Sequence, residues 1–255
     1  MRAKASALHM GLLLLRDLLR ARFPEEAESW CWFLRMWFYK LKRLVSSFFY
    51  PPRCPYCRDL LAPGGILCAQ CQEIFKVQPQ VSMIELDYSK KVCAVSAFLY
   101  EGKVRDAICD FKFRENVDYV DHFAMSVVSA IRKSGFRTEF DIITCVPMSQ
   151  KNKKSRGFNQ SEVLAKTVSK LVGATYRETI KKIKVNKTQH SLNREERILN
   201  VKGAYGILDK NYVKNRDILL CDDILTTGST LKECALKLSD AGAKSILCAT
   251  IAKTP

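Results

Sequence analysis

An uncharged run that ends in two adjacent aspartates constrains this chain more than any other feature. Residues 217–230 are Asp-Ile-Leu-Leu-Cys-Asp-Asp-Ile-Leu-Thr-Thr-Gly-Ser-Thr, and a helix-like pattern follows them. An apolar run of this length is typical of a buried strand. The strand would end at Asp222 and Asp223, so both carboxylates are expected at the carboxyl edge of a sheet, where open α/β sheets bind ligands.

The loop after the aspartates is rich in hydroxyl groups and contains one glycine. Its backbone NH groups would point out at the positive end of the following helix dipole, and Gly228 would let a phosphate approach the backbone. An ordinary capped helix is the alternative interpretation. A P-loop is excluded, because the Gly-Lys-Ser/Thr ending is absent. The expected ligand-binding residues are Asp222, Asp223, Thr226, Thr227, Gly228, Ser229 and Thr230.

Strand-like and helix-like segments alternate through the rest of the second half of the chain. Strands separated by helices of this length indicate βαβ units, so the predicted fold class is α/β, with a mainly parallel sheet flanked by helices. The predicted strands are 93–100, 141–146, 217–221 and 245–251, and the predicted helices are 104–113, 122–133, 161–171 and 229–241.

Two Cys-x-x-Cys pairs lie ten residues apart near the start of this region, as Cys54 with Cys57 and Cys68 with Cys71. Four thiolates at this spacing make a closed tetrahedral zinc site, which folds a short segment and leaves no open position for catalysis. Two disulfides are the competing interpretation. Most of the other cysteines stand singly in apolar runs, where a free thiol behaves as a small hydrophobe, so we expect a reducing, cytoplasmic compartment.

Residues 219–230 resemble the phosphoribosyl-pyrophosphate motif of type I phosphoribosyltransferases. From Cys54 onward the chain is similar to the ComF family, which includes competence factors acting in DNA uptake and GntX-like proteins, and which has an amino-terminal zinc ribbon. Val-Pro-Met-Ser at 146–149 with Arg-Gly-Phe-Asn-Gln at 156–160 resembles the family's pyrophosphate loop. Lys-Thr-Gln-His-Ser-Leu at 187–192, with the residues around 197–203, resembles its flexible loop.

The resemblance implies roles for these residues and a type I phosphoribosyltransferase fold. Asp222 and Asp223 would hold the ribose hydroxyls and help to place a hydrated magnesium, and residues 226–230 would bind the 5-phosphate. The pyrophosphate loop would contribute Ser149, Lys151, Arg156 and Gly157, and the flexible loop Gln189, His190, Arg197 and Asn200. Oxygen ligands on one side and positive charge on the other suit a magnesium-bound diphosphate.

The other two histidines, His9 and His122, are interpreted as surface or helix-face residues without a partner. For His190, a contact with phosphate or base and an idle loop position both remain open.

The first fifty residues interleave aromatic and basic side chains and predict an amphipathic helix from Met36, which is also a second candidate start codon. Such a helix could contact an anionic membrane surface or single-stranded DNA, or pack on the protein itself. Neither a signal peptide nor a spanning helix is expected. We therefore divide the chain into a basic aromatic extension (1–53), a four-cysteine zinc ribbon (54–71), a linker (72–91) and a phosphoribosyltransferase-like domain (92–255).

The formal net charge of +16 suits a phosphorylated small molecule, a nucleic acid or a solvated basic face. Three functions stay open. The first is a phosphoribosyltransferase with an unknown acceptor. The second is a protein that binds magnesium phosphoribosyl pyrophosphate and acts on single-stranded DNA in natural transformation, beside a helicase or membrane channel of the uptake machinery. The third is a sensor of the sugar phosphate without turnover.

Overall fold

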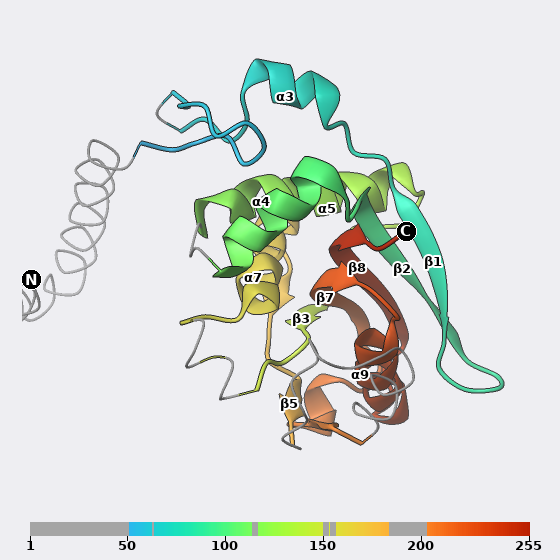
Figure 1. The fold of residues 1–255 in the computed structure, drawn as a ribbon. Helices are drawn as coiled ribbons and strands as arrows, with labels where there is room; N and C mark the ends of the chain where they lie inside the picture. The colour runs from blue at the N-terminus through green and yellow to red at the C-terminus, as the bar shows by residue number, and fades with distance from the viewer. Residues whose placement is uncertain (1–50, 63, 114–116, 150–152, 154–156, 184–202) are drawn as a thin grey trace, which may run out of the picture. The chain divides into compact units, whose positions relative to one another are not determined.

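The computed structural model describes residues 51–62, 64–113, 117–149, 153, 157–183 and 203–255 (Figure 1). The expected amino-terminal helix, the membrane contact through residues 1–50 and the flexible-loop residues therefore lie outside the described part of the chain. Within that part, no helix is long and apolar enough to cross a membrane.

A six-stranded sheet forms the centre of the described protein. Its strand order is β1-β2-β8-β7-β3-β4, and every neighbouring pair is parallel except the β1–β2 hairpin. This arrangement confirms the predicted mainly parallel α/β sheet. The strands are β1 (Gln80–Glu85), β2 (Lys91–Leu99), β3 (Ile142–Cys145), β4 (Thr175–Tyr176), β7 (Asp217–Leu225) and β8 (Ser245–Lys253).

Helices cover both faces of this sheet (Figure 1). The helices on the sheet are α4 (Gly102–Phe113), α5 (Val120–Lys133), α7 (Gln160–Val172) and α9 (Ser229–Asp240). Helix α3 (Ala69–Ile74) belongs to the segment that carries the cysteines, and short 3-10 turns lie at Val117–Tyr119 and Lys210–Tyr212. A separate two-stranded antiparallel sheet joins β5 (Ile180–Lys182) to β6 (Tyr205–Ile207).

Strand β7 is buried on both sides: its side chains alternate between the two faces of the sheet, and helices cover both faces. Ile218 and Leu220 belong to the core on the α9 side. Leu219 and Cys221 belong to the core that α4, α5 and α7 share. All four are fully buried, which explains why the sequence here is a continuous apolar run rather than an alternating one.

In the sheet, the structure differs from the sequence-based expectations at two places. Strand β7 does not end at Cys221 but runs to Leu225, so the two aspartates belong to its last part. Residues 72–91, expected to be a linker, contain β1, which pairs with β2 at the edge of the sheet. Val81 and Met83 are exposed and only Ile84 of β1 is buried, so no alternation of buried apolar residues marked this edge strand in the sequence.

Candidate phosphate and metal sites

The two aspartates lie at the switch point of the sheet, where the connections from the neighbouring strands β3 and β7 run in opposite directions. Strand β3 continues through α7 to β4 on one side of the strand order, whereas β7 continues through α9 to β8 on the other. Helices α7 and α9 pack on opposite faces. A crevice at the carboxyl ends of two such strands is the usual ligand site of an open α/β sheet.

Beyond this point β7 loses one of its two neighbours. The β3–β7 pairing ends at Cys145 and Cys221, whereas the pairing with β8 continues to Leu225. Asp222 and Asp223 therefore come directly after the last β3 pair, as the sequence predicted for carboxylates at the edge of the sheet.

Asp222 is held by two hydrogen bonds to one carboxylate oxygen. The Ser161 hydroxyl donates to Asp222 Oδ1 at 2.7 Å, and the Asp223 backbone NH donates to the same atom at 2.9 Å. Burial, together with the negative charge of Asp223, raises the pKa of Asp222 from 3.8 to about 7. Near neutral pH the carboxyl of the ligand-free protein is therefore partly protonated, and its deprotonated form accepts hydrogen bonds from hydroxyl groups.

Asp223 forms an ion pair that sequence analysis missed. The Lys112 ammonium, in the last turn of α4, lies 2.8 Å from Asp223 Oδ2, and the side chains are only 14% and 17% exposed. The Gln160 side-chain amide donates to the Lys112 backbone carbonyl at 3.1 Å. Nothing in the sequence around Lys112 indicates this contact, because it joins segments more than one hundred residues apart.

The hydroxyl-rich loop forms the amino terminus of α9. Gly228 has φ +76°, in the left-handed region that favours glycine, and it is the residue that precedes the helix. Thr227 and Ser229 are joined through their hydroxyls, and the Ser229 backbone NH donates to Thr227 Oγ1 at 3.4 Å. The first turn holds no acidic residue, so the helix dipole presents an uncompensated positive end here.

The end of the expected flexible-loop region is fastened to the same helix. The Gly203 backbone NH donates to Glu233 Oε1 at 2.8 Å, and buried Tyr205 belongs to the same hydrophobic cluster as Leu231 of α9. Burial raises the pKa of Tyr205, so its hydroxyl stays protonated at neutral pH. Gln189, His190, Arg197 and Asn200 themselves lie outside the described residues.

The expected pyrophosphate loop is described only in part. Ser149 and Gly157 are described, the latter at φ +77°, whereas Lys151 and Arg156 are not. The Asn159 side chain accepts from the Ser161 backbone NH at the start of α7 and donates to the Val146 carbonyl at 3.2 Å. Asn159 thus ties the amino terminus of α7 to the end of β3, which places Ser161 against Asp222.

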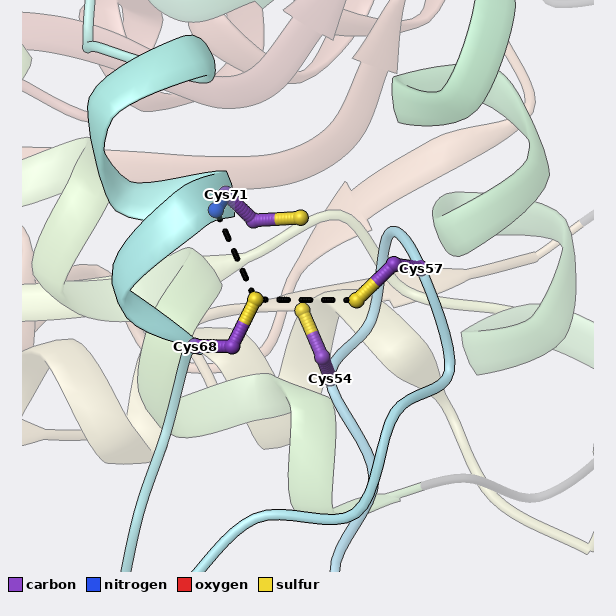
Figure 2. A group of neighbouring side chains, drawn as sticks. All are labelled: Cys54, Cys57, Cys68 and Cys71. Atoms are coloured by element: carbon purple, nitrogen blue, oxygen red, sulfur yellow. Dashed lines mark hydrogen bonds between the residues drawn. The ribbon is translucent and has the colours of Figure 1, made fainter.

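The four cysteines of the two Cys-x-x-Cys pairs come together (Figure 2). All four Sγ atoms lie within 4.8 Å of one another, and the Cys57 and Cys68 sulfurs are 3.6 Å apart. Tetrahedral zinc with bonds of about 2.3 Å needs sulfurs a little under 4 Å apart, whereas a disulfide needs about 2.05 Å. The four cysteines are free thiols, so the geometry fits a zinc ion and not the alternative of two disulfides.

Electrostatics in the cluster also suit a bound dication. Burial acts to raise the pKa of the Cys54 thiol, but hydrogen bonds from the backbone of Cys57, Cys68 and Tyr56 lower it to about 7. Burial and the neighbouring thiols raise the pKa of Cys57 to about 11, and that of Cys71 as well. Further negative charge is therefore unfavourable in this cluster unless a cation compensates it.

His122 is not the unpartnered surface residue that the sequence indicated. It is buried, and its Nε2 lies 2.8 Å from the hydroxyl of Tyr56, between the first two cysteines. Burial lowers the pKa of His122 to about 4, so the ring is neutral at physiological pH. Tyr56 also stacks on Phe75 at a centroid distance of 4.0 Å. The cysteine segment therefore packs on α5 through an aromatic cluster that periodicity could not reveal.

The mainly parallel sheet, with its acidic pair and hydroxyl-rich helix terminus at the switch point, defines a phosphoribosyltransferase-like domain joined to a four-cysteine module. The family model described as "Phosphoribosyl transferase domain" matches residues 153–255. The glutamine phosphoribosylpyrophosphate amidotransferase of B. subtilis, solved with ADP and GMP, is 20% identical with a TM-score of 0.34, over 57% of this chain and 27% of that one.

Two curated relatives cover most of the chain. Competence protein F of Haemophilus influenzae is 28% identical over 78% of this chain and 95% of its own length. DNA utilization protein YhgH of Salmonella typhi is 32% identical over 78% of this chain and 84% of its own length. The chain belongs to this family of Competence protein F and DNA utilization protein YhgH.

Proposed function

We propose that this protein binds magnesium phosphoribosyl pyrophosphate at the carboxyl ends of β3 and β7. Asp222 and Asp223 would hold the ribose hydroxyls, and the loop of residues 226–230 would bind the 5-phosphate. The observation that supports the proposal most is an acidic pair in β7 followed, five residues later, by the amino terminus of α9, whose first turn holds no acidic residue.

Each part of this ligand has a chemically matched partner in the site. A carboxylate accepts hydrogen bonds from two adjacent hydroxyls, and hydroxyl side chains with backbone NH groups at a helix terminus bind a phosphate. A hydrated magnesium would neutralise the diphosphate, with the acidic pair contacting its waters. The segment after the neighbouring strand β3 would contribute Ser149 and Gly157 to the pyrophosphate site, with Lys151 and Arg156 as its expected positive charges.

Calorimetric titration with magnesium phosphoribosyl pyrophosphate tests this proposal. The double variant Asp222→Asn, Asp223→Asn is expected to lose binding while keeping the wild-type circular dichroism spectrum. Asp240→Asn, an exposed aspartate at the far end of α9, is the matched control and should bind as wild type does. Absence of binding by the wild type would refute the proposal.

We also propose that the protein acts on single-stranded DNA during DNA uptake, with the uptake helicase or channel as further partners. This follows the names of its relatives, Competence protein F and DNA utilization protein YhgH, and the net charge of +16. Phosphate contacts release counterions, so the affinity for a labelled oligonucleotide should fall steeply with salt. Fluorescence anisotropy at several salt concentrations measures this, and a flat salt dependence would contradict the proposal.

Turnover is a separate question from binding. If the site is catalytic, the chain would bring the ribose donor and an acceptor together and stabilise charge as pyrophosphate leaves. Release of pyrophosphate in the presence of a panel of nucleobases and amines identifies an enzyme. Binding of the sugar diphosphate with no release across that panel supports the sensing role instead.

A further inference from the structure

A strained arginine directly follows the second cysteine of the metal cluster. Arg58 has φ +64°, and it shares the left-handed region with only one other non-glycine residue of the described chain, Asn215. Asparagine tolerates this conformation, but for a long side chain it is unfavourable, and glycine would adopt it without strain. The turn itself needs only backbone atoms, since the Arg58 NH donates to the Cys54 carbonyl at 2.9 Å.

The side chain of Arg58 contacts helix α4. Its guanidinium lies 3.0 Å from Asp110 Oδ2, and the Asp110 side chain is only 8% exposed. The Arg58 side chain itself is 53% exposed, but the shielded carboxylate makes this ion pair stronger than one between two fully exposed groups. This contact, rather than the turn, explains why an arginine occupies a position that suits glycine.

Helix α4 also supplies the cation of the acidic pair. Lys112 lies two residues after Asp110, which is about 200° around a helix, so the two side chains leave α4 on opposite sides. Asp110 meets the cysteine module through Arg58, and Lys112 meets Asp223 at 2.8 Å. The position of α4 therefore determines both contacts.

The first turn of α7 holds both the end of α4 and the acidic pair. Gln160, fully buried, holds the backbone carbonyl of Lys112, and the next residue, Ser161, holds Asp222. The acidic pair is therefore anchored on α7, and the position of the Lys112 ammonium relative to it depends on how the end of α4 packs against that helix.

We infer that Arg58 is a positioning residue for the sugar-phosphate site. Through Asp110 and α4, it fixes the position of the Lys112 ammonium, which in turn orients the Asp223 carboxylate. This inference rests on the proposed function. The cysteine module is thereby a support for ligand binding and not only a folding unit. Lys112 is the residue through which the effect of Arg58 reaches the ligand.

Arg58→Gly separates positioning from stability, because glycine relieves the backbone strain while removing the ion pair. We expect it to keep zinc and a near wild-type melting temperature, yet to weaken calorimetric binding of magnesium phosphoribosyl pyrophosphate about fivefold. Asn215→Gly, the other left-handed position, is the matched control and should not change affinity. Unchanged affinity in Arg58→Gly would overturn the inference.

A double-mutant cycle tests the route. Lys112→Met alone should weaken binding, and adding Arg58→Gly to it should produce no further loss. Additive losses would mean that Arg58 acts independently of Lys112 and would also overturn the inference.

A ligand-free measurement distinguishes this inference from the proposed function. Arg58→Gly should speed amide hydrogen exchange in the last turn of α4 and at residues 222–225, whereas Asn215→Gly should not. If the wild type binds no sugar diphosphate but this exchange pattern appears, the proposed function fails and the positioning role stands. Unchanged exchange at these residues would refute the positioning role.

Discussion

At the scale of single residues, the site combines two carboxylates, one paired with a cation and the other hydrogen-bonded to uncharged donors. Asp223 faces the Lys112 ammonium, whereas Asp222 accepts only uncharged donors, from Ser161 and the Asp223 backbone, among the contacts described. Partial burial of Asp222 beside the charge of Asp223 disfavours its charged form, and its pKa rises to about 7. Binding residues arranged in this way reduce folding stability in favour of ligand recognition.

Asp222→Asn should therefore stabilise the ligand-free protein at alkaline pH. A carboxyl whose folded pKa is raised from 3.8 to about 7 contributes stability below pH 4 that is lost as the pH rises through 7. The amide avoids this loss, so we expect a gain on the order of 2 kcal/mol at pH 8 and little difference near pH 4. Urea titrations in chelating buffer measure it, and a variant less stable than wild type at pH 8 would contradict it.

Gly228 tests the phosphate loop with a control that carries equal strain. An alanine at φ +76° costs about 1 kcal/mol for its backbone conformation, and its Cβ would make an ordinary van der Waals contact with Leu225 Cδ1 at 3.5 Å. Gly228→Ala should lose that stability and at least tenfold in sugar-diphosphate affinity, because the loop backbone shifts. Gly173→Ala, at φ +71° after α7, should lose similar stability but bind normally. If calorimetry gave Gly228→Ala and Gly173→Ala the same affinity, the loop at Gly228 would have no role in binding.

At the scale of elements, the sequence predicted what is local and missed what is distant. The uncharged run before Asp222 is buried in the sheet, and α5, α7 and α9 each bury one apolar face. These local patterns allowed the strand and the three helices to be predicted. The spacing of the four cysteines likewise allowed their clustering to be predicted, because each Cys-x-x-Cys pair brings two sulfurs together. The Lys112–Asp223 and Tyr56–His122 contacts join segments 111 and 66 residues apart, and only tertiary packing creates them.

The start of β7 is fastened by a charge cluster at the end opposite the site. Hydrogen bonds from Ser245 and Lys244, with Arg137, lower the pKa of Asp217 to about 2. A depressed folded pKa contributes stability above pH 4 that is lost as the pH falls toward 2. Asp217→Asn should therefore melt at a lower temperature than wild type at pH 7, with the difference shrinking by pH 3. A difference that is constant with pH would refute this role.

At the scale of the whole molecule, the cysteine module and the α/β domain share one hydrophobic core. Cys54, Tyr56 and Cys71 are buried in the same cluster as Phe111 of α4 and Phe123 of α5. A structural metal contributes its binding free energy to folding. Loss of the metal should therefore destabilise the sheet domain as well as residues 54–75.

The variant Cys68→Ser tests this coupling. Cys93→Ser is the control, because Cys93 is a partly buried cysteine of β2 outside the four-cysteine cluster. We expect one zinc per chain in wild type and Cys93→Ser, and a clear reduction of zinc in Cys68→Ser, measured by atomic emission. Because Tyr56 would leave His122 and Phe75, the main thermal transition of Cys68→Ser should fall by several degrees, and proteolysis between residues 54 and 75 should accelerate. An unchanged main transition in metal-depleted protein would show that the module folds independently of the domain on which it packs.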